Sequence, residues 1–318
     1  MQAVHVVSVA TCAMPELTYL LVSADRVGVT PKLLGLGDKR LTFLHRDYSA
    51  KPDIVRAWLR GALAAGTVQY NDLVVCVDAF DVVIKRGVEA IVQGWTSAGS
   101  PSVLFSAEKG LYPRLDLRAH FDAANPTAPY RYINAGTYMG TAAGVLHLLD
   151  TPEMQSTGED DQGMMQAAWV KYHDLYPWVL DVHRHVFYVP IRDTLADVLT
   201  VARTMPTPIF HFAGDKGRPM LQAAFLEWYP DSVQPNVDVR YWRKQAQLSK
   251  RVQGGARVAG IAGVAGVVDR LPEPEPEPAA SSQQHAWIAA AVIVAAIIVS
   301  VCALTATCLL SHHRRQKF

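Results

Sequence analysis

Apolar and polar residues alternate along the first hundred positions in a pattern that predicts strands and helices in turn. Short apolar runs, typical of buried strands, occupy 4–10, 31–37, 73–84 and 101–108. Apolar residues recur at helical spacing over 14–28, 52–66 and 87–95. Such alternation predicts an α/β domain with a largely parallel sheet, in which ligands bind at the carboxyl ends of the strands.

The third apolar run, VVCVDAFDVVI from Val74, contains two aspartates, Asp78 and Asp81. Isolated charges in a core cost several kcal/mol, so we expect the strand to turn near Val77 and to bring both carboxylates to the rim of the sheet. Two hard oxygen ligands there suit Mg²⁺ or Mn²⁺. The alternative is that Asp78 ends the strand and Asp81 hydrogen-bonds its own turn.

Later segments place further polar side chains at expected element ends. FSAEKGLYP puts Glu108 just after a strand, and RYINAGTYMGTAAGV puts Asn134 in a tight glycine-containing turn before a helical stretch. GEDDQGMMQAAW places Asp160 and Asp161 at the start of a helix. Aspartate is favoured there for capping alone, so one of the two needs no catalytic role.

A histidine follows a short apolar run near the end of the predicted domain. In IFHFAGDKGRP, His211 is followed by Gly214 and Lys216 in a glycine-rich basic turn. A lone histidine is more often structural than a ligand, but successive backbone amides in such a turn suit a phosphate.

Composition excludes several classes of protein. The chain has 318 residues and a formal net charge of +1, which gives no electrostatic footprint for nucleic acid. No GxGxxG follows the first strand, so the usual dinucleotide-binding fold is not supported. None of the four cysteines forms a CxxC pair, and Cys76 is expected to be a small buried apolar residue.

The C-terminal region differs from the folded domain, which we expect to span 1–245. A Gly/Ala-rich and Pro-Glu linker occupies 246–285, and a basic tail occupies 311–318. Between them, 286–310 carries no charge and exceeds the ~20 apolar residues that a membrane helix needs. A single membrane span is therefore predicted. Its position without a preceding signal peptide favours a cytosolic domain, whereas the basic tail favours a domain in the lumen of the ER or Golgi.

Seven motifs occur in the order of a known family over nearly all of residues 1–220. They are VSVAT, LLGLGDK, VDAFDVV, FSAE, YINAGTYMG, EDDQ and HFAGDK. This set resembles the glycosyltransferase domain of the procollagen lysyl hydroxylases (the PLOD type) and is similar to related collagen-modifying glycosyltransferases. The resemblance implies a GT-A fold, in which a Rossmann-like nucleotide-binding mixed sheet is flanked by helices and holds a UDP-sugar through a divalent metal.

The resemblance also implies roles for residues. Asp78, Asp81 and His211 match the ligands of Mn²⁺ or Mg²⁺. Positions that contact or border the donor are matched by Thr11, Phe80, Glu108, Tyr112, Gly214 and Lys216. Catalytic positions are matched by Asn134, Asp160 and Asp161. Lys51 stands near a basic position of the family, in a segment that is shorter here.

The implied reaction moves glucose from UDP-glucose, or galactose from UDP-galactose, to hydroxylysine or galactosyl-hydroxylysine in a collagen-like protein. Two alternatives are transfer to another protein or a lipid-linked glycan, and a catalytically inactive, membrane-tethered nucleotide-sugar binding module. Two departures from the family keep the second alternative open: Phe80 stands where the family has Tyr, and Tyr112 where it has Trp. Thr137 is a further departure, at the second Gly of the family's turn. A nucleotidyltransferase would need a glycine-rich triphosphate loop, which the sequence does not offer.

Overall fold

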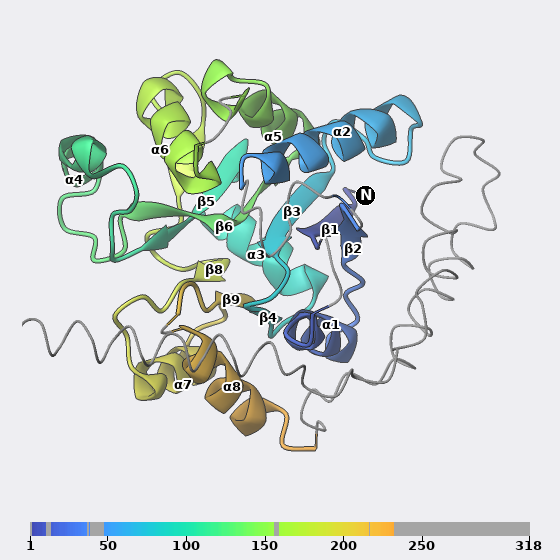
Figure 1. Ribbon diagram of the computed structural model, residues 1–318, viewed down its shortest axis with the longest axis vertical. Helices are drawn as coiled ribbons and strands as arrows, with labels where there is room; N and C mark the ends of the chain where they lie inside the picture. The colour runs from blue at the N-terminus through green and yellow to red at the C-terminus, as the bar shows by residue number, and fades with distance from the viewer. Residues whose placement is uncertain are drawn as a thin grey trace, which may run out of the picture. The chain divides into compact units, whose positions relative to one another are not determined.

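A six-stranded sheet, in the order β2-β1-β3-β6-β5-β7, lies at the centre of the molecule (Figure 1). The computed structural model describes residues 2–10, 14–36, 38, 48–155, 159–215 and 217–231. The strands of this sheet are β1 (Val4–Val9), β2 (Lys32–Leu34), β3 (Leu73–Asp78), β5 (Val103–Glu108), β6 (Tyr132–Thr141) and β7 (Trp178–Leu180).

The sheet is mixed because one strand runs against the others. β1 pairs in parallel with β2 and β3, and β5 pairs in parallel with β7. β6 lies between β3 and β5 and is antiparallel to both. Five of the six described strands therefore share one direction, which confirms the predicted largely parallel sheet and gives the mixed sheet of a GT-A-like α/β fold.

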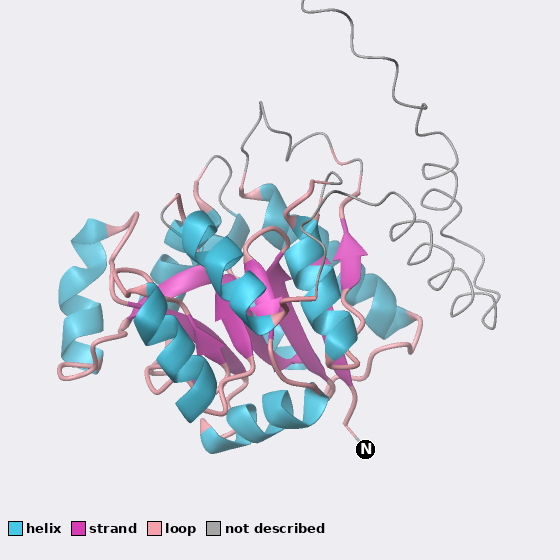
Figure 2. Cartoon of the chain, turned by 90° about the horizontal axis from the view of Figure 1, so that it is seen from below, coloured by secondary structure: helices cyan, strands magenta, loops and turns pink. Residues whose placement is uncertain are grey.

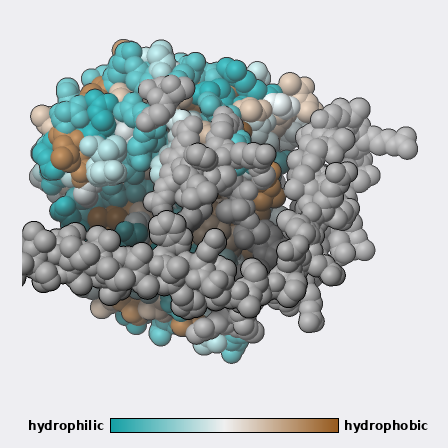
Figure 3. Space-filling model, viewed as in Figure 1, coloured by the Kyte–Doolittle hydropathy of each residue, from teal (hydrophilic) through white to brown (hydrophobic). Residues whose placement is uncertain are grey.

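Helices cover both faces of the sheet (Figure 2). One face packs against α2 (Ala50–Ala64), α5 (Ala142–Leu149) and α6 (Asp161–Tyr172), and the other against α1 (Leu17–Arg26) and α3 (Val88–Ser97). Side chains of β3 alternate between the two cores, since Val74 and Cys76 lie in the first and Val75 and Val77 in the second. Cys76 is a free, buried thiol, as predicted. The outer surface over α5 and α6 is mainly hydrophilic (Figure 3).

A smaller sheet, in the order β4-β9-β8, joins distant parts of the chain. Its strands are β4 (Val82–Ile84), β8 (Phe187–Tyr188) and β9 (Ile209–His211). β4 and β9 are antiparallel, with Val82 opposite His211. Because β4 follows β3 after a short turn, this pairing carries His211 to the end of the central sheet. The remaining helices are α4 (Arg118–Ala124), α7 (Leu195–Thr204), α8 (Gly217–Trp228) and the 3₁₀ segments Leu115–Leu117 and Pro152–Gln155.

The run 73–84 turns close to the predicted place and forms two strands in different sheets, because the chain leaves the central sheet at Asp78 and enters the smaller one at Val82. Another sequence prediction needs correction. The tight turn predicted at Asn134 is wrong, because this residue lies inside β6 and is paired with Ser106 of β5, which overrides the local glycine signal.

The described helices are each too short or too polar to span a membrane. The predicted span, 286–310, lies outside the described residues, as do the linker and the basic tail. The domain boundary at 245 therefore remains a prediction.

Candidate functional site

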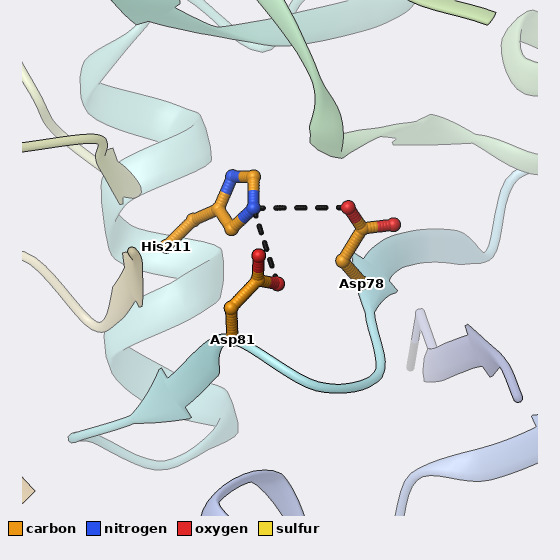
Figure 4. Close-up of side chains that lie close together, drawn as sticks. All are labelled: Asp78, Asp81 and His211. Carbon is orange, nitrogen blue, oxygen red and sulfur yellow. Dashed lines mark ion pairs between the residues drawn. The ribbon is translucent and has the colours of Figure 1, made fainter. Parts of the chain in front are cut away.

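Asp78, Asp81 and His211 converge at the carboxyl end of β3 (Figure 4). Asp78 is the last residue of β3, Asp81 precedes β4, and His211 ends β9. His211 Nε2 lies 3.3 Å from Asp81 Oδ1 and 3.7 Å from Asp78 Oδ2. The turn between β3 and β4 thus brings both carboxylates of the apolar run to one point, as the sequence predicts.

The three side chains fit a divalent cation. One ligand atom from each lies within 4.8 Å of the other two, and neighbouring ligands of a small octahedral ion lie about 3 Å apart. Within the described part of the chain, both ring nitrogens of His211 are buried and Nδ1 makes no hydrogen bond, and a buried polar atom without a partner is costly. Burial alone would lower the pKa of His211, but Asp81 and Asp78 hold it above its usual value. The same two carboxylates would hold a metal ion at Nε2.

Gly136 of β6 allows the cluster to form. A Cβ atom at this position would lie 2.1 Å from His211 Cε1 and 2.7 Å from Asp78 Oδ2. The pairing of β5 with β6 shifts register at this point, from Phe105 opposite Tyr138 to Ser106 opposite Asn134. The resulting bulge sets Gly136 against the metal-ligand candidates, so that backbone rather than a side chain faces them.

Lys51 of α2 joins the cluster from the opposite side. Its Nζ lies 2.8 Å from Asp78 Oδ1 and 2.8 Å from Asp161 Oδ2. Burial alone would lower the pKa of Lys51, but Asp161 and Asp78 hold it above its usual value, so the ammonium stays charged. Lys51 therefore links the candidate metal ligands to the acidic start of α6.

The two acidic residues at the start of α6 have different surroundings. Asp160 is the N-cap, and its side chain accepts a hydrogen bond from the Gln162 amide at 2.9 Å. Asp161 is 6% exposed. Burial raises the pKa of Asp161 above its usual value, an effect that Lys51 opposes. The predicted capping role thus belongs to Asp160, whereas Asp161 points into the site.

A buried network of amides and a carboxyl group lies beside the cluster. Asn134 donates to Glu108 Oε2 at 3.1 Å, and its Oδ1 accepts from the Gly136 amide at 3.0 Å. Gln162 donates to Glu108 Oε1 at 3.2 Å and to the Tyr112 carbonyl, while its Oε1 accepts from the Ala135 amide. Burial raises the pKa of Glu108 to about 7. The network fixes the backbone of β6 around Gly136.

Most of these residues border a recess of about 170 Å³ that is open to solvent. Its lining brings together the following residues: Tyr48, Lys51, Asp78, Asp81, Tyr112, Asn134, Ala135, Gly136, Asp160, Asp161, Gln162, His211, Ala213 and Gly214. Tyr112 is 66% exposed at its edge, and Gly214 has a φ of +75°, which glycine adopts without strain.

Two other predicted site residues, Phe80 and Glu108, do not line the recess. Phe80 packs against the apolar cluster of α1 and α3 instead of lining the recess. Glu108 lies behind the lining and reaches it through Asn134 and Gln162. Thr11 and Lys216 are outside the described residues.

Sequence reasoning missed two residues that shape the recess, Gln162 and Gly136, and assigned no role to a third, Lys51. Lys51 lies in a segment with no motif of its own, so only its place near a basic family position indicates it. Gln162 belongs to the EDDQ motif, but only the two aspartates of that motif were assigned roles. Gly136 has no side-chain chemistry to signal a role, and only the contacts that a methyl group would make at its position reveal one.

Comparison with known proteins identifies a family for this chain. The family model described as the PLOD GT domain matches residues 1–189 of the chain. The match covers both aspartates of the candidate metal site and the start of α6, and it ends before His211. No curated protein matches the chain significantly.

Proposed function

The chain belongs to the PLOD GT domain family, a family of glycosyltransferases, and on this basis we propose that it transfers glucose or galactose from a UDP-sugar. The acceptor in this proposal is hydroxylysine or galactosyl-hydroxylysine of a collagen-like protein. The observation that carries the proposal is the convergence of Asp78, Asp81 and His211, because His211 lies beyond the matched residues and still completes the cluster.

The residues of the recess fit the chemistry of glycosyl transfer. The bond between the sugar C1 and the diphosphate oxygen breaks, its electron pair leaves with UDP, and the acceptor oxygen bonds to C1 as its hydroxyl proton is released. Asp78, Asp81 and His211 would hold Mn²⁺ or Mg²⁺, which acts as a Lewis acid for the leaving diphosphate. Asp161 would face the positive charge that develops at the sugar. Stereochemistry at C1, whether retained or inverted, is left open.

A positive charge is available for the diphosphate from the protein itself. Lys51 lines the recess and stays protonated, and fixed positive charges aimed at a developing anion are worth several kcal/mol in catalysis. We propose that Lys216 adds a second charge, on the basis of the HFAGDK motif. Thr11 and Gly214 complete the proposed donor contacts.

The anchoring of the domain is a separate part of the proposal. An uncharged segment at 286–310 is long enough to span a bilayer, and we propose that it tethers the domain to a membrane with the domain in the cytosol. Protease treatment of sealed vesicles checks the orientation, since full protection of the domain would place it in the lumen.

UDP release by the 318-residue chain tests the activity. The assay uses Mn²⁺, a panel of UDP-sugars and a galactosyl-hydroxylysine peptide, and compares Asp78→Ala and His211→Ala with the wild type. We expect both variants to lose about 10³-fold in metal-dependent release, the equivalent of a Lewis-acid contribution of ~4 kcal/mol.

Matched control variants separate loss of the site from general damage. Asp174→Ala removes an aspartate whose side chain is 89% exposed beyond the C-terminal end of α6, and His120→Ala removes an exposed histidine of α4. Both should release UDP like the wild type. If the wild type binds UDP with Mn²⁺ but turns over no donor with any acceptor, the protein is a nucleotide-sugar binding module instead.

A further inference from the structure

Lys51 shares one carboxylate with the candidate metal site. Its ammonium contacts Asp78 Oδ1 at 2.8 Å, while Oδ2 of the same group faces His211 Nε2 at 3.7 Å. An ion held by Asp78, Asp81 and His211 would therefore have a positive charge on the far side of one of its ligands. Two cations that share a carboxylate at this range repel each other, and the repulsion is stronger beside partly buried groups than in bulk water.

We propose that Lys51 is an internal competitor of the metal, which weakens metal binding until a donor diphosphate draws its ammonium away. This inference rests on the proposed function, because it needs a diphosphate in the recess. Lys51 would keep its contact with Asp161 and exchange Asp78 for a phosphate oxygen. Metal and donor would then each bind better in the presence of the other, which is a coupling between two ligands of one site.

The surroundings of Lys51 fit such an exchange. The side chain is 19% exposed and belongs to the lining of the recess, so an incoming anion can reach it. The ring of Tyr48 lies 5.8 Å from Nζ on the same lining and would favour the ammonium in a position closer to solvent. Lysine is a flexible point charge, whereas the planar guanidinium of arginine is directional.

A purely structural ion pair makes a different prediction. Removal of Lys51 leaves an uncompensated carboxylate, which destabilises the protein and attracts a cation more strongly in either case. A lysine that stays on Asp78 when UDP binds, however, gives no reason for UDP to improve Mn²⁺ binding more in the wild type than in a variant without the Lys51 charge. The change in Mn²⁺ affinity on addition of UDP therefore distinguishes a competitor from a structural pair.

The test measures Mn²⁺ binding to the full 318-residue chain by titration calorimetry, with and without saturating UDP. Lys51→Met removes the charge and keeps the length of the side chain, and Lys51→Arg keeps the charge. We expect Lys51→Met to bind Mn²⁺ about tenfold more tightly without UDP and to gain less from UDP than the wild type. Lys51→Arg should bind Mn²⁺ without UDP as weakly as the wild type.

A second pair of variants covers the case in which Lys51→Met fails to fold. Asp161→Asn is compared with Asp161→Asn carrying Lys51→Met, so that neither leaves Asp161 as an unpaired charge. The double variant should bind Mn²⁺ more tightly than the single one. Unchanged or weaker Mn²⁺ binding on loss of the Lys51 charge, or an equal gain from UDP with and without that charge, in either background, would overturn the inference.

Failure of the proposed function gives a different result. If the wild type neither binds UDP with Mn²⁺ nor releases it from any donor, the proposed activity is wrong, whatever the Lys51 variants do. If the wild type is active and loss of the Lys51 charge leaves the Mn²⁺ affinity unchanged, only the competitor role is wrong.

Discussion

Asp78 and Asp181 occupy equivalent places in the central sheet and have opposite surroundings. Asp78 ends β3 and Asp181 follows β7, and these two strands run in the same direction. Asp181 is 1% exposed and accepts hydrogen bonds from the backbone amides of His185, Val186 and Phe187 at 2.7–2.8 Å. Asp78 faces a lysine, a histidine and an open recess.

The difference shows what makes a strand-end carboxylate available for chemistry. A carboxylate that accepts several backbone amides is already used by the fold, since each bond satisfies a buried donor. The cluster of Asp78, Asp81 and His211 instead brings one ligand atom of each residue within 4.8 Å of the other two, and among the described residues Asp78 pairs with the side chains of Lys51 and His211. Position at the end of a strand is therefore weaker evidence of function than the partners of the side chain.

The largest effects on activity and on stability are expected from substitution of Asp81 in the candidate metal site and of Asp181 after β7. Asp81→Ala should reduce metal-dependent UDP release by about 10³-fold and change the free energy of unfolding by less than ~1 kcal/mol. Asp181→Ala should cost about 3 kcal/mol of stability, because three buried amides lose their acceptor, and keep the activity per folded molecule. Urea unfolding and UDP release on the same samples measure both. A stability loss in Asp81→Ala as large as that in Asp181→Ala would contradict the comparison.

Two glycines of β6 offer the same contrast between a residue of the metal site and a residue of the fold, with smaller expected effects of substitution. A methyl group at Gly136 would strike His211, whereas one at Gly140 would lie 2.0 Å from the carbonyl oxygen of Ser102. We expect Gly136→Ala to weaken Mn²⁺ binding about tenfold or more, since the metal ligand must move. Gly140→Ala should instead lower stability by about 2 kcal/mol through overpacking. Calorimetric Mn²⁺ titration and urea unfolding of both variants check the assignment, and equal Mn²⁺ affinities would refute it.

Glu108 is intermediate between Asp78 and Asp181: it is buried, as Asp181 is, but the donors to its carboxyl group are side-chain amides. Its pKa, raised by burial to about 7, exceeds the usual value of 4.5. The folded state therefore holds a proton that the unfolded state loses, so stability should fall as pH rises from about 4.5 to 7 and level off above. The slope contributed is at most about 1.4 kcal/mol per pH unit. Glu108→Gln mimics the neutral form and should lack this slope in urea unfolding between pH 4.5 and 8; an unchanged slope would show that Glu108 is ionised throughout.

The smallest effect is expected at the start of α6. Asp160→Ala removes the N-cap and should cost about 1 kcal/mol, whereas Asp160→Asn keeps a capping oxygen and should cost little. Urea unfolding of the two variants beside the wild type measures the difference. Equal stability of the two variants would mean that the cap contributes nothing here.

The elements that sequence predicted well are those set by local patterns. The alternation of apolar runs located β1, α1, α2, α3 and β5, and the same pattern placed Asp78 and Asp81 at the rim of the sheet. His211 was indicated by a motif and brought into place by its pairing opposite Val82 in the smaller sheet. A single sequence carries no signal for that long-range pairing, so the meeting of His211 with the two aspartates rested on the family resemblance.

The residues that were misjudged depend on contacts between distant segments. Asn134 was predicted to occupy a turn because glycine and asparagine favour turns. However, β6 is paired with a strand on each side, and the residues near Gly136 form a bulge at the register shift with β5. Phe80 was assigned to the donor site from its place inside the metal motif; its partly buried side chain packs against the apolar cluster of α1 and α3, and its contact with a donor stays a prediction. Lys51 is separated from Asp161 by more than a hundred positions, and no spacing rule connects them.

The pairing of β4 with β9 sets the time at which the metal-ligand cluster is completed during synthesis. Asp78 and Asp81 leave the ribosome long before His211, and β9 supplies the last ligand after all the strands of the central sheet have been made. At ~5–20 residues per second the interval lasts many seconds. A nascent chain that ends near residue 189 contains the whole matched family region and lacks the histidine, so it cannot yet hold the ion with all three ligands.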